Sequence, residues 1–335
     1  MPNNATLPII DLMPLSSPEP TIDALTALSQ SLSTALSTTG FAYLINAPLT
    51  FTHADIFALA HDFFSLPEEE KLSVAKKTFV PQNTNTYRGF FPTQAGSDNL
   101  KEGFEIGPST PLPGILDPRA KFNLTEPNVW PAAFQSRDGT EMLHGELQSL
   151  SAKLLSLLAI ALAKPPSYFD AYLHSSTSTL RLLHYPPITP PSPRQELCCT
   201  PHTDSGLLTL LHQDETGGLE VLSADGQWVA APYVEGSIVV NIGDLMSKVS
   251  GGRFRATWHR VRSSAGRARF SVPCFFERGG GWWGGCVDDD GEGEGAGVLY
   301  GRHVLEKMSG WVEFRDVEVG KGAVVETVEE VGVGA

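Results

Sequence analysis

Three residues in the second half of the chain have the types and the spacing of a metal site. His202 and Asp204 are separated by a single residue, and in an extended segment two such residues project to the same face. An iron(II) site that must also bind a co-substrate and oxygen uses two histidines and one carboxylate. The third ligand is therefore expected on a neighbouring strand. His259 is the best candidate, because it lies in a run of alternating apolar residues.

Arg269 and Ser271 form a second polar pair with the same spacing. They also share one face of an extended segment, and a guanidinium group beside a hydroxyl is suited to binding a carboxylate through two hydrogen bonds. A metal with open positions next to such an anchor is the arrangement that an iron enzyme using a 2-oxo acid requires.

These groups must be positioned by short strands. The residues at 263–266 are turn formers, so the flanking segments 256–262 and 267–276 are predicted to pair as a hairpin. That pairing would place His259 roughly opposite Arg269 to Ser271. The hairpin is therefore expected to bring the third metal ligand close to the carboxylate anchor.

The region from residue 198 onward consists of short apolar segments separated by turns. Asp225-Gly226 is a hairpin signal within it, and regular spacing of this kind predicts an antiparallel barrel or sandwich. His212 also lies in this region. We do not expect His212 to bind a metal, because the nearest carboxylate, Asp214, is at a turn.

Each motif has a simpler explanation when it is taken alone. A His-x-Asp triplet occurs by chance in many chains. A histidine in a strand is more often a core or surface residue than a ligand. Arg269 alone would also fit an exposed position on the outside of a barrel. A triplet, a distant strand histidine and an Arg-x-Ser pair are far less expected together. We therefore interpret them as one site.

The whole segment resembles the catalytic core of the iron(II)- and 2-oxoglutarate-dependent dioxygenases, in their isopenicillin N synthase-like branch. The resemblance extends over roughly residues 7 to 277. The matching stretches are His202-x-Asp204, His259-Arg260-Val261, Arg269-x-Ser271, Gly217-Gly218-Leu219-Glu220-Val221, Asn241-Ile242-Gly243-Asp244 and Leu180-Arg181-Leu182-Leu183-His184-Tyr185-Pro186-Pro187.

The resemblance implies a fold, a set of cofactors and roles for individual residues. The implied fold is mainly β with flanking α, a double-stranded β-helix (jelly-roll) core wrapped by N-terminal helices. The implied cofactors are Fe(2+), 2-oxoglutarate as co-substrate, and O2. By resemblance His202, Asp204 and His259 bind the iron, while Arg269 and Ser271, helped by Tyr185, hold the distal carboxylate of 2-oxoglutarate.

The implied function is oxidation of an unactivated C–H bond in a small organic metabolite, in specialised-metabolite biosynthesis. Hydroxylation is the default outcome, and desaturation, ring closure or ring expansion remain open, as does the identity of the substrate. Two other functions also remain open. One is an iron oxidase of the isopenicillin N synthase type, which takes no 2-oxoglutarate, and the other is a metal-free jelly-roll binding protein. A zinc hydrolase is disfavoured because no additional general base accompanies the three ligands.

The bulk properties are those of a soluble globular protein with 335 residues and 41% hydrophobic residues. The net charge of −14 argues against a nucleic-acid or anionic-membrane partner, since both require clustered lysine and arginine. No apolar run is long enough for a membrane helix, and from the residues at the start of the sequence we expect no secretory signal. Four cysteines without a disulfide-like spacing indicate a reduced, cytoplasmic protein. The oligomeric state is left undetermined.

Three regions are expected along the chain. Residues 1–120 form an N-terminal region of strands and helices, and residues 121–315 form the jelly-roll oxygenase core. The core includes a long support helix at 139–163, whose leucines recur at intervals of three and four, and a flexible Gly- and Asp-rich insert at 279–297. Residues 316–335 form an acidic tail.

The Gly-, Pro- and Asn-rich segment 80–128 is expected to run over the mouth of the barrel, as it does in the family that the chain resembles. Tyr87, Phe91 and Phe104 lie within this segment and are the candidate substrate contacts. An alternative is that these aromatic side chains only fix a long loop in place. The aromatic segment and the apolar strands favour an apolar or aromatic substrate.

Overall fold

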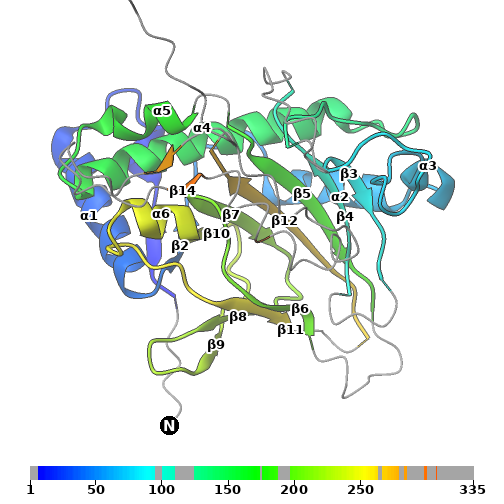
Figure 1. Cartoon of the computed structure of the whole chain (residues 1–335). Coiled ribbons are helices and arrows are strands. Elements are labelled where there is room, and N and C mark those ends of the chain that lie inside the picture. Colours follow the sequence, from blue (N-terminus) through cyan, green and yellow to red (C-terminus); the bar gives the residue numbers. More distant parts are fainter. Residues whose placement is uncertain are drawn as a thin grey trace, which may run out of the picture.

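Two β-sheets facing each other form the centre of the protein in the computed structural model (Figure 1). The structure describes residues 7–94, 100–109, 124–173, 176–187, 197–262, 266–278, 283–284, 298–299 and 307. The larger sheet has eight strands in the order β1-β2-β10-β7-β12-β5-β4-β3, and the smaller sheet has four in the order β6-β11-β8-β9. The predicted jelly-roll core with flanking helices is confirmed.

The strands are short and mostly buried. Those of the larger sheet are β1 (Ile9–Asp11), β2 (Phe41–Ile45), β3 (Gly89–Phe91), β4 (Glu102–Ile106), β5 (Thr179–Tyr185), β7 (Leu208–Gln213), β10 (Ile238–Ile242) and β12 (Arg269–Phe276). Those of the smaller sheet are β6 (Leu197–His202), β8 (Leu219–Leu222), β9 (Trp228–Ala230) and β11 (His259–Arg262). All five residues of β10 are buried, which places covering layers on both faces of the larger sheet.

Helices cover the outer face of the larger sheet, and α4 runs along it in Figure 1. The helices are α1 (Ile22–Thr38), α2 (His53–Phe64), α3 (Glu68–Ser73), α4 (Arg137–Ala161), α5 (Asp170–Leu173) and α6 (Asp244–Val249), with 3-10 turns at Met13–Ser16 and Pro166–Phe169. A capping box starts α2, in which Thr52 and Asp55 satisfy each other's backbone N–H groups. The predicted leucine face of α4, exemplified by Leu147 and Leu154, is buried in the main core.

The predicted hairpin between 256–262 and 267–276 is wrong. β11 pairs with β6 and β8 in the smaller sheet, whereas β12 pairs with β5 and β7 in the larger sheet. The turn formers lie between the two strands in the sequence, but they do not determine whether both strands join the same sheet. The chain crosses between the sheets here, so the two strands face each other across the interior. In contrast, the hairpin predicted at Asp225-Gly226 is confirmed, since β8 and β9 pair with Leu222 opposite Trp228.

The C-terminal part of the chain lies largely outside the described residues. The short strands β13 (Trp283–Gly284) and β14 (Val298–Leu299) pair antiparallel, the first within the predicted insert at 279–297 and the second just after it. The rest of that insert and the predicted tail at 316–335 are not described. Among the described residues, no helix is both long and apolar enough to cross a membrane.

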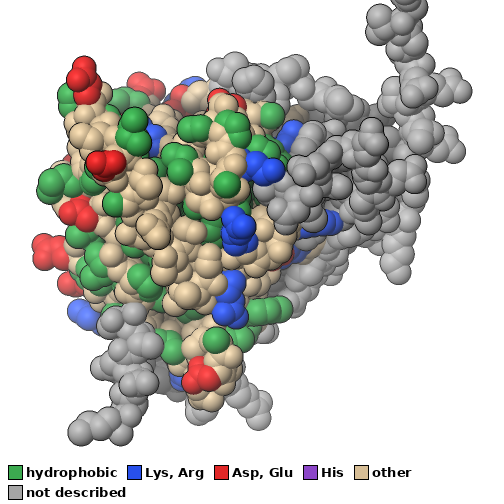
Figure 2. All heavy atoms as spheres, turned by 90° about the vertical axis from the view of Figure 1, so that its left-hand side faces the viewer, with side chains coloured by type: hydrophobic (Ala, Val, Ile, Leu, Met, Phe, Trp, Pro, Cys, Tyr) green, Lys and Arg blue, Asp and Glu red, His purple; other side chains and the backbone are tan. Residues whose placement is uncertain are grey.

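The face of the molecule on the α1 side shows hydrophobic, basic and acidic side chains close together (Figure 2). Acidic side chains gather mainly toward one edge of this face, and several basic side chains lie nearer its middle. Among the described residues that this view shows, the two signs of charge are thus both present on one face.

Candidate active site

A cavity lies between the two sheets and is lined by alternate residues of the strands. β5 contributes Arg181, Leu183 and Tyr185, and β12 contributes Arg269 and Ser271, among others. This period of two is what an extended chain produces, because successive side chains point to opposite faces. The side chains of His202 and Asp204 therefore point into the same interior space as those of Arg269 and Ser271, although the two pairs come from opposite sides of the cavity.

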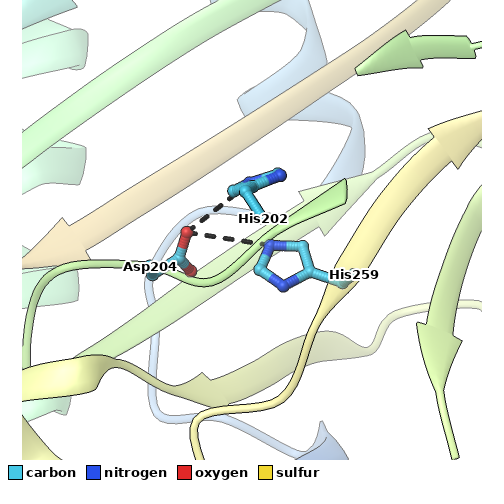
Figure 3. Close-up of side chains that lie close together, drawn as sticks. All are labelled: His202, Asp204 and His259. Atoms are coloured by element: carbon cyan, nitrogen blue, oxygen red, sulfur yellow. Dashed lines mark ion pairs between the residues drawn. The ribbon is translucent and has the colours of Figure 1, made fainter. Parts of the chain in front are cut away.

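The three predicted metal ligands meet in this cavity (Figure 3). His202 and His259 are register partners on β6 and β11, and their ring centroids are 4.2 Å apart. Asp204 Oδ1 lies 3.8 Å from His202 Nε2 and 3.7 Å from His259 Nε2. Each residue offers one ligand atom, and these atoms lie within 4.8 Å of one another. His202 is the last residue of β6.

Backbone carbonyls fix the orientation of both imidazoles. His202 Nδ1 lies 2.8 Å from the carbonyl oxygen of Thr200, and His259 Nδ1 lies 3.1 Å from that of Thr257. A proton on each Nδ1 is therefore donated to a carbonyl two residues earlier, and Nε2 is the ring nitrogen that faces Asp204. Such hydrogen bonds select the tautomer that a metal-binding histidine needs.

Two side chains of the larger sheet hold the carboxylate of Asp204. Thr209 Oγ1 donates to Asp204 Oδ2 at 2.6 Å, and Asn241 Nδ2 donates to the same oxygen at 2.7 Å. The other oxygen, Oδ1, is the one that faces the imidazoles. Burial by itself raises the pKa of Asp204, but His259 and His202 and these two hydrogen bonds hold it below the ordinary value. The carboxylate is thus kept in its anionic form.

Sequence reasoning gave no role to Thr209 or Asn241. Asn241 stands in one of the stretches that carry the family resemblance, but nothing in the stretch indicates which residue it contacts. No motif includes Thr209. The one indication in the sequence is its spacing, since it lies two residues before Leu211, which also lines the cavity.

Replacing Asn241 with alanine is expected to weaken iron(II) binding by roughly tenfold to a hundredfold, the usual effect of removing a hydrogen bond to a metal ligand. The reason is that Asp204 Oδ2 loses one of its two donors and the carboxylate becomes free to rotate. Anaerobic titration of the apoprotein with iron(II) measures the dissociation constant. Thr209→Val is the matched variant, and wild-type affinity in both variants would contradict this role.

Two glycines allow the loop that carries Asp204 to pack tightly against its neighbours. A Cβ atom on Gly206 would lie 2.5 Å from the carbonyl oxygen of Phe276, and one on Gly243 would lie 2.2 Å from the carbonyl oxygen of Gly206. Both contacts are shorter than side chains tolerate. The backbone N–H of Asp244 also donates to the carbonyl of Asp204 at 2.8 Å, so the loop is held along its length.

Arg269 lies deep in the cavity and is held by three neighbours. It is 3% exposed, its Nε donates to the carbonyl of Gly217 at 2.6 Å, and its Nη1 donates to Ser271 Oγ at 2.9 Å. The guanidinium carbon lies 4.7 Å from the ring centre of Tyr185, the residue opposite Arg269 in the β5–β12 register. Arg269, Ser271 and Tyr185 thus form one cationic, hydrogen-bonding corner of the cavity.

The three candidate substrate contacts lie in different places. Tyr87 lines the cavity. Phe91 is buried in a small cluster that includes Leu183 and Val261, two residues of the cavity wall. Phe104 lies in the main hydrophobic core, stacked on Phe63 at a centroid distance of 4.1 Å. For Phe104 the alternative explanation holds, since a strand position facing the helices is used for packing rather than for contact with the cavity.

His212 is not one of the three converging ligand residues, and its side chain lies on the other face of β7. It follows the inward-facing Leu211 on β7, and its ring lies 6.3 Å from that of His53 on the outer side of the sheet. Neither ring nitrogen has a hydrogen-bond partner among the described residues. Burial, reinforced by the neighbouring His53, lowers the pKa of His212 to about 3.

Replacing His212 with leucine is expected to make the apoprotein less sensitive to acid. In the unfolded chain this histidine gains a proton near pH 6.5, whereas the folded protein holds it neutral down to about pH 3. As the pH falls below about 6.5, the wild type is therefore expected to lose about 1 kcal/mol more stability per pH unit than the variant. Urea unfolding at pH 7.5, 6 and 5 measures the difference. Parallel stability profiles of the two proteins would show that His212 is not responsible.

Comparison with known proteins identifies the family of this chain. Residues 176–278 match the profile of the 2OG-Fe(II) oxygenase superfamily, and residues 7–133 match that of the non-haem dioxygenase in morphine synthesis N-terminal region. The 2-oxoglutarate-dependent dioxygenase citB of Monascus ruber is 32% identical over 81% of this chain and 84% of its own length. The chain belongs to the 2OG-Fe(II) oxygenase superfamily. It is a 2-oxoglutarate-dependent dioxygenase, and its cofactors are Fe(2+), 2-oxoglutarate and O2.

Two further proteins place this 2OG-Fe(II) oxygenase among its relatives. The 2-oxoglutarate-Fe(II) type oxidoreductase hxnY of Emericella nidulans is 35% identical over 65% of this chain, which spans 64% of the length of that relative. The crystal structure of a full-length Neurospora crassa protein in complex with alpha-KG and thymine superposes with a TM-score of 0.75 at 25% identity, covering 92% of this chain and 98% of the other.

The residues of this 2OG-Fe(II) oxygenase fit the metal that the superfamily uses. Two imidazole nitrogens and one carboxylate oxygen converge, and each is oriented by a hydrogen bond to its remaining polar atom. Three ligands on one face, with the others left to co-substrate and oxygen, are typical of non-haem iron(II) oxygenases. The cationic corner at Arg269 lies in the same cavity and fits the carboxylate of a 2-oxo acid.

Proposed function

We propose that this dioxygenase oxidises an unactivated C–H bond of a small organic metabolite in specialised-metabolite biosynthesis, with hydroxylation as the default outcome. The observation that carries the proposal is one cavity that holds the His202–Asp204–His259 cluster together with Arg269 and Ser271. Iron(II) with 2-oxoglutarate and oxygen supplies the oxidising power when bound, and the protein contributes binding, orientation and exclusion of water.

In the proposed function each group in the cavity has a positional role. His202, Asp204 and His259 hold the iron on one face, and the hydrogen bonds of their other polar atoms fix the ligand atoms before the metal arrives. Arg269 and Ser271 pair with the distal carboxylate of 2-oxoglutarate through charge-assisted hydrogen bonds. Tyr185 lies against the guanidinium of Arg269 and limits its movement.

The similar proteins support a small-molecule substrate. The Neurospora crassa structure contains thymine, a single-ring compound, and the fungal relatives are named as dioxygenases or oxidoreductases of the 2-oxoglutarate type. We extend this to the present chain as part of the proposal. The apolar strands that line the cavity are consistent with a substrate that has an apolar body.

Anaerobic titration of the iron(II)-loaded protein with 2-oxoglutarate tests the proposal. Chelation of the metal by the 2-oxo acid is expected to produce a visible charge-transfer band that saturates with added 2-oxoglutarate. Binding of iron without this band would favour an oxidase that uses no 2-oxoglutarate. Failure to bind iron would mean that the similarity to the family is one of fold alone.

A further inference from the structure

The loop that carries Asp204, between β6 and β7, is bonded to the start of α6. Three consecutive backbone N–H groups, those of Gly243, Asp244 and Leu245, donate to carbonyl oxygens of this loop. The N–H of Asp244 donates to Asp204 at 2.8 Å, and that of Leu245 donates to Ser205 at 3.2 Å. A shift of α6 relative to the loop would therefore move the backbone of Asp204.

A lysine from a distant part of the chain joins the same loop to α6 through its side chain. Lys307 Nζ donates to Thr203 Oγ1 at 3.0 Å and forms an ion pair with Asp244 Oδ2. Thr203 stands between His202 and Asp204 in the sequence, and Asp244 is the residue whose N–H holds the carbonyl of Asp204. One ammonium group therefore contacts both the loop and the helix to which the loop is bonded.

Lys307 lies outside the part of the chain that the superfamily profile matches, which ends at residue 278. It is 104 residues from Thr203 and 63 residues from Asp244 in the sequence. The side chains of Lys307 and Asp244 are 19% and 27% exposed. An ion pair with this exposure is screened by solvent and adds little to the stability of a fold. Its effect is therefore expected on the position of the groups that it joins.

We propose that Lys307 is a positioning residue for the iron site. Its ammonium group holds Thr203 and Asp244 at a fixed separation, and it thereby fixes the backbone from which His202 and Asp204 project. This role rests on the proposed function, because it takes His202 and Asp204 as iron ligands. A metal site binds its ion more tightly when the surrounding groups hold the ligands in the binding geometry.

The charge of Lys307 and its contacts affect iron(II) affinity in opposite directions. An ammonium group near the site repels a divalent cation, so removal of the charge alone would raise the affinity. Removal of the two contacts made by Nζ lowers the affinity, because the loop that carries Asp204 gains freedom. A fall in affinity when the ammonium group is removed therefore identifies positioning, since the change in charge would have the opposite effect.

Anaerobic titration of the full-length apoprotein with iron(II) tests the proposal. Lys307→Met removes the donors and is expected to raise the dissociation constant by roughly fivefold to tenfold, less than the loss of a hydrogen bond made directly to a ligand. Lys307→Arg keeps the charge and the donors and is expected to stay within about threefold of the wild type. Lys248→Met is the matched control, because Lys248 is an exposed basic residue on α6, and it is expected to bind iron(II) as the wild type does.

Hydrogen exchange of the apoprotein examines the same connection without iron. The backbone amide of Asp244, which donates to Asp204, is expected to exchange roughly fivefold to tenfold faster in Lys307→Met than in the wild type. The amides of α4 are expected to be unchanged, since only a general loss of stability would affect them. Thr203→Val removes one acceptor of Lys307 Nζ and is expected to weaken iron(II) binding in the same direction, so it tests the proposal should Lys307→Met fail to fold.

The failures of the two proposals can be told apart. If the wild type binds no iron(II), the proposed function is wrong, and the role of Lys307 that rests on it is overturned as well. If the wild type binds iron(II) and Lys307→Met binds it equally or more tightly, the role of Lys307 is wrong and the proposed function stands. Faster exchange in α4 as well as at Asp244 would also overturn this role, because Lys307 would then stabilise the whole fold rather than position the loop.

Discussion

Replacing His202 with alanine is expected to lower turnover by about a thousandfold or more, because loss of a metal ligand removes several kcal/mol of catalytic stabilisation. Folding is expected to change little. The side chain of His202 is 33% exposed and lies at the end of β6, so its removal leaves no large cavity. The thermal midpoint of the apoprotein is expected to move by only a few degrees, corresponding to about 1 kcal/mol.

The measurements for this variant are iron(II) affinity, succinate formation and thermal unfolding of the apoprotein. His61→Ala is the matched control, since His61 lies on α2 against Phe270 and outside the cavity. It is expected to retain wild-type iron affinity. Turnover within a factor of a few of wild type in His202→Ala would exclude His202 as a ligand, whereas unfolding would indicate a structural role.

Replacing Arg269 with lysine is expected to raise the dissociation constant of 2-oxoglutarate by roughly tenfold to a hundredfold while leaving iron affinity unchanged. A lysine retains the charge but cannot form the planar fork, and one lost hydrogen bond to a charged group accounts for a change of this size. The lysine ammonium must also replace the contacts that Arg269 makes with Gly217 and Ser271.

The charge-transfer band gives the 2-oxoglutarate affinity of this variant directly. Arg267→Lys is the matched control, because Arg267 is exposed two residues earlier in the chain and is expected to be neutral. Wild-type 2-oxoglutarate affinity in Arg269→Lys would show that the distal carboxylate is bound elsewhere in the cavity. A parallel loss of iron affinity would indicate a general disturbance of the site.

The sequence was sufficient to predict which ligand types meet, because alternation along a strand is a local property. His202 and Asp204 share a face whatever sheet they join, and so do Arg269 and Ser271. The predicted hairpin failed because the partner of a strand is decided by the packing of distant segments. β11 and β12 are neighbours in the chain, but they complete opposite sheets.

The groups that support the ligands could not be predicted from the sequence for the same reason. The contact between Asn241 and Asp204 joins β10 to the loop after β6, and the contact between Arg269 and Gly217 joins β12 to the turn before β8. Neither contact follows from local spacing. Phe104 is an example of the opposite case, in which the sequence suggested a site residue. It was a candidate for substrate contact at the cavity, but it packs in the hydrophobic core.

The supporting contacts connect the two sheets, and they therefore affect how the sheets move relative to each other. His202 and His259 belong to the smaller sheet, while Asp204 is tied to Thr209 and Asn241 of the larger sheet. Arg269 of the larger sheet is likewise tied to the turn at Gly217 that leads into the smaller sheet. Bound iron and bound 2-oxoglutarate would each link the smaller sheet to the larger sheet across the cavity. Each ligand should therefore increase the affinity of the protein for the other. The backbone amides of β6 and β11 should exchange with solvent more slowly when both ligands are bound.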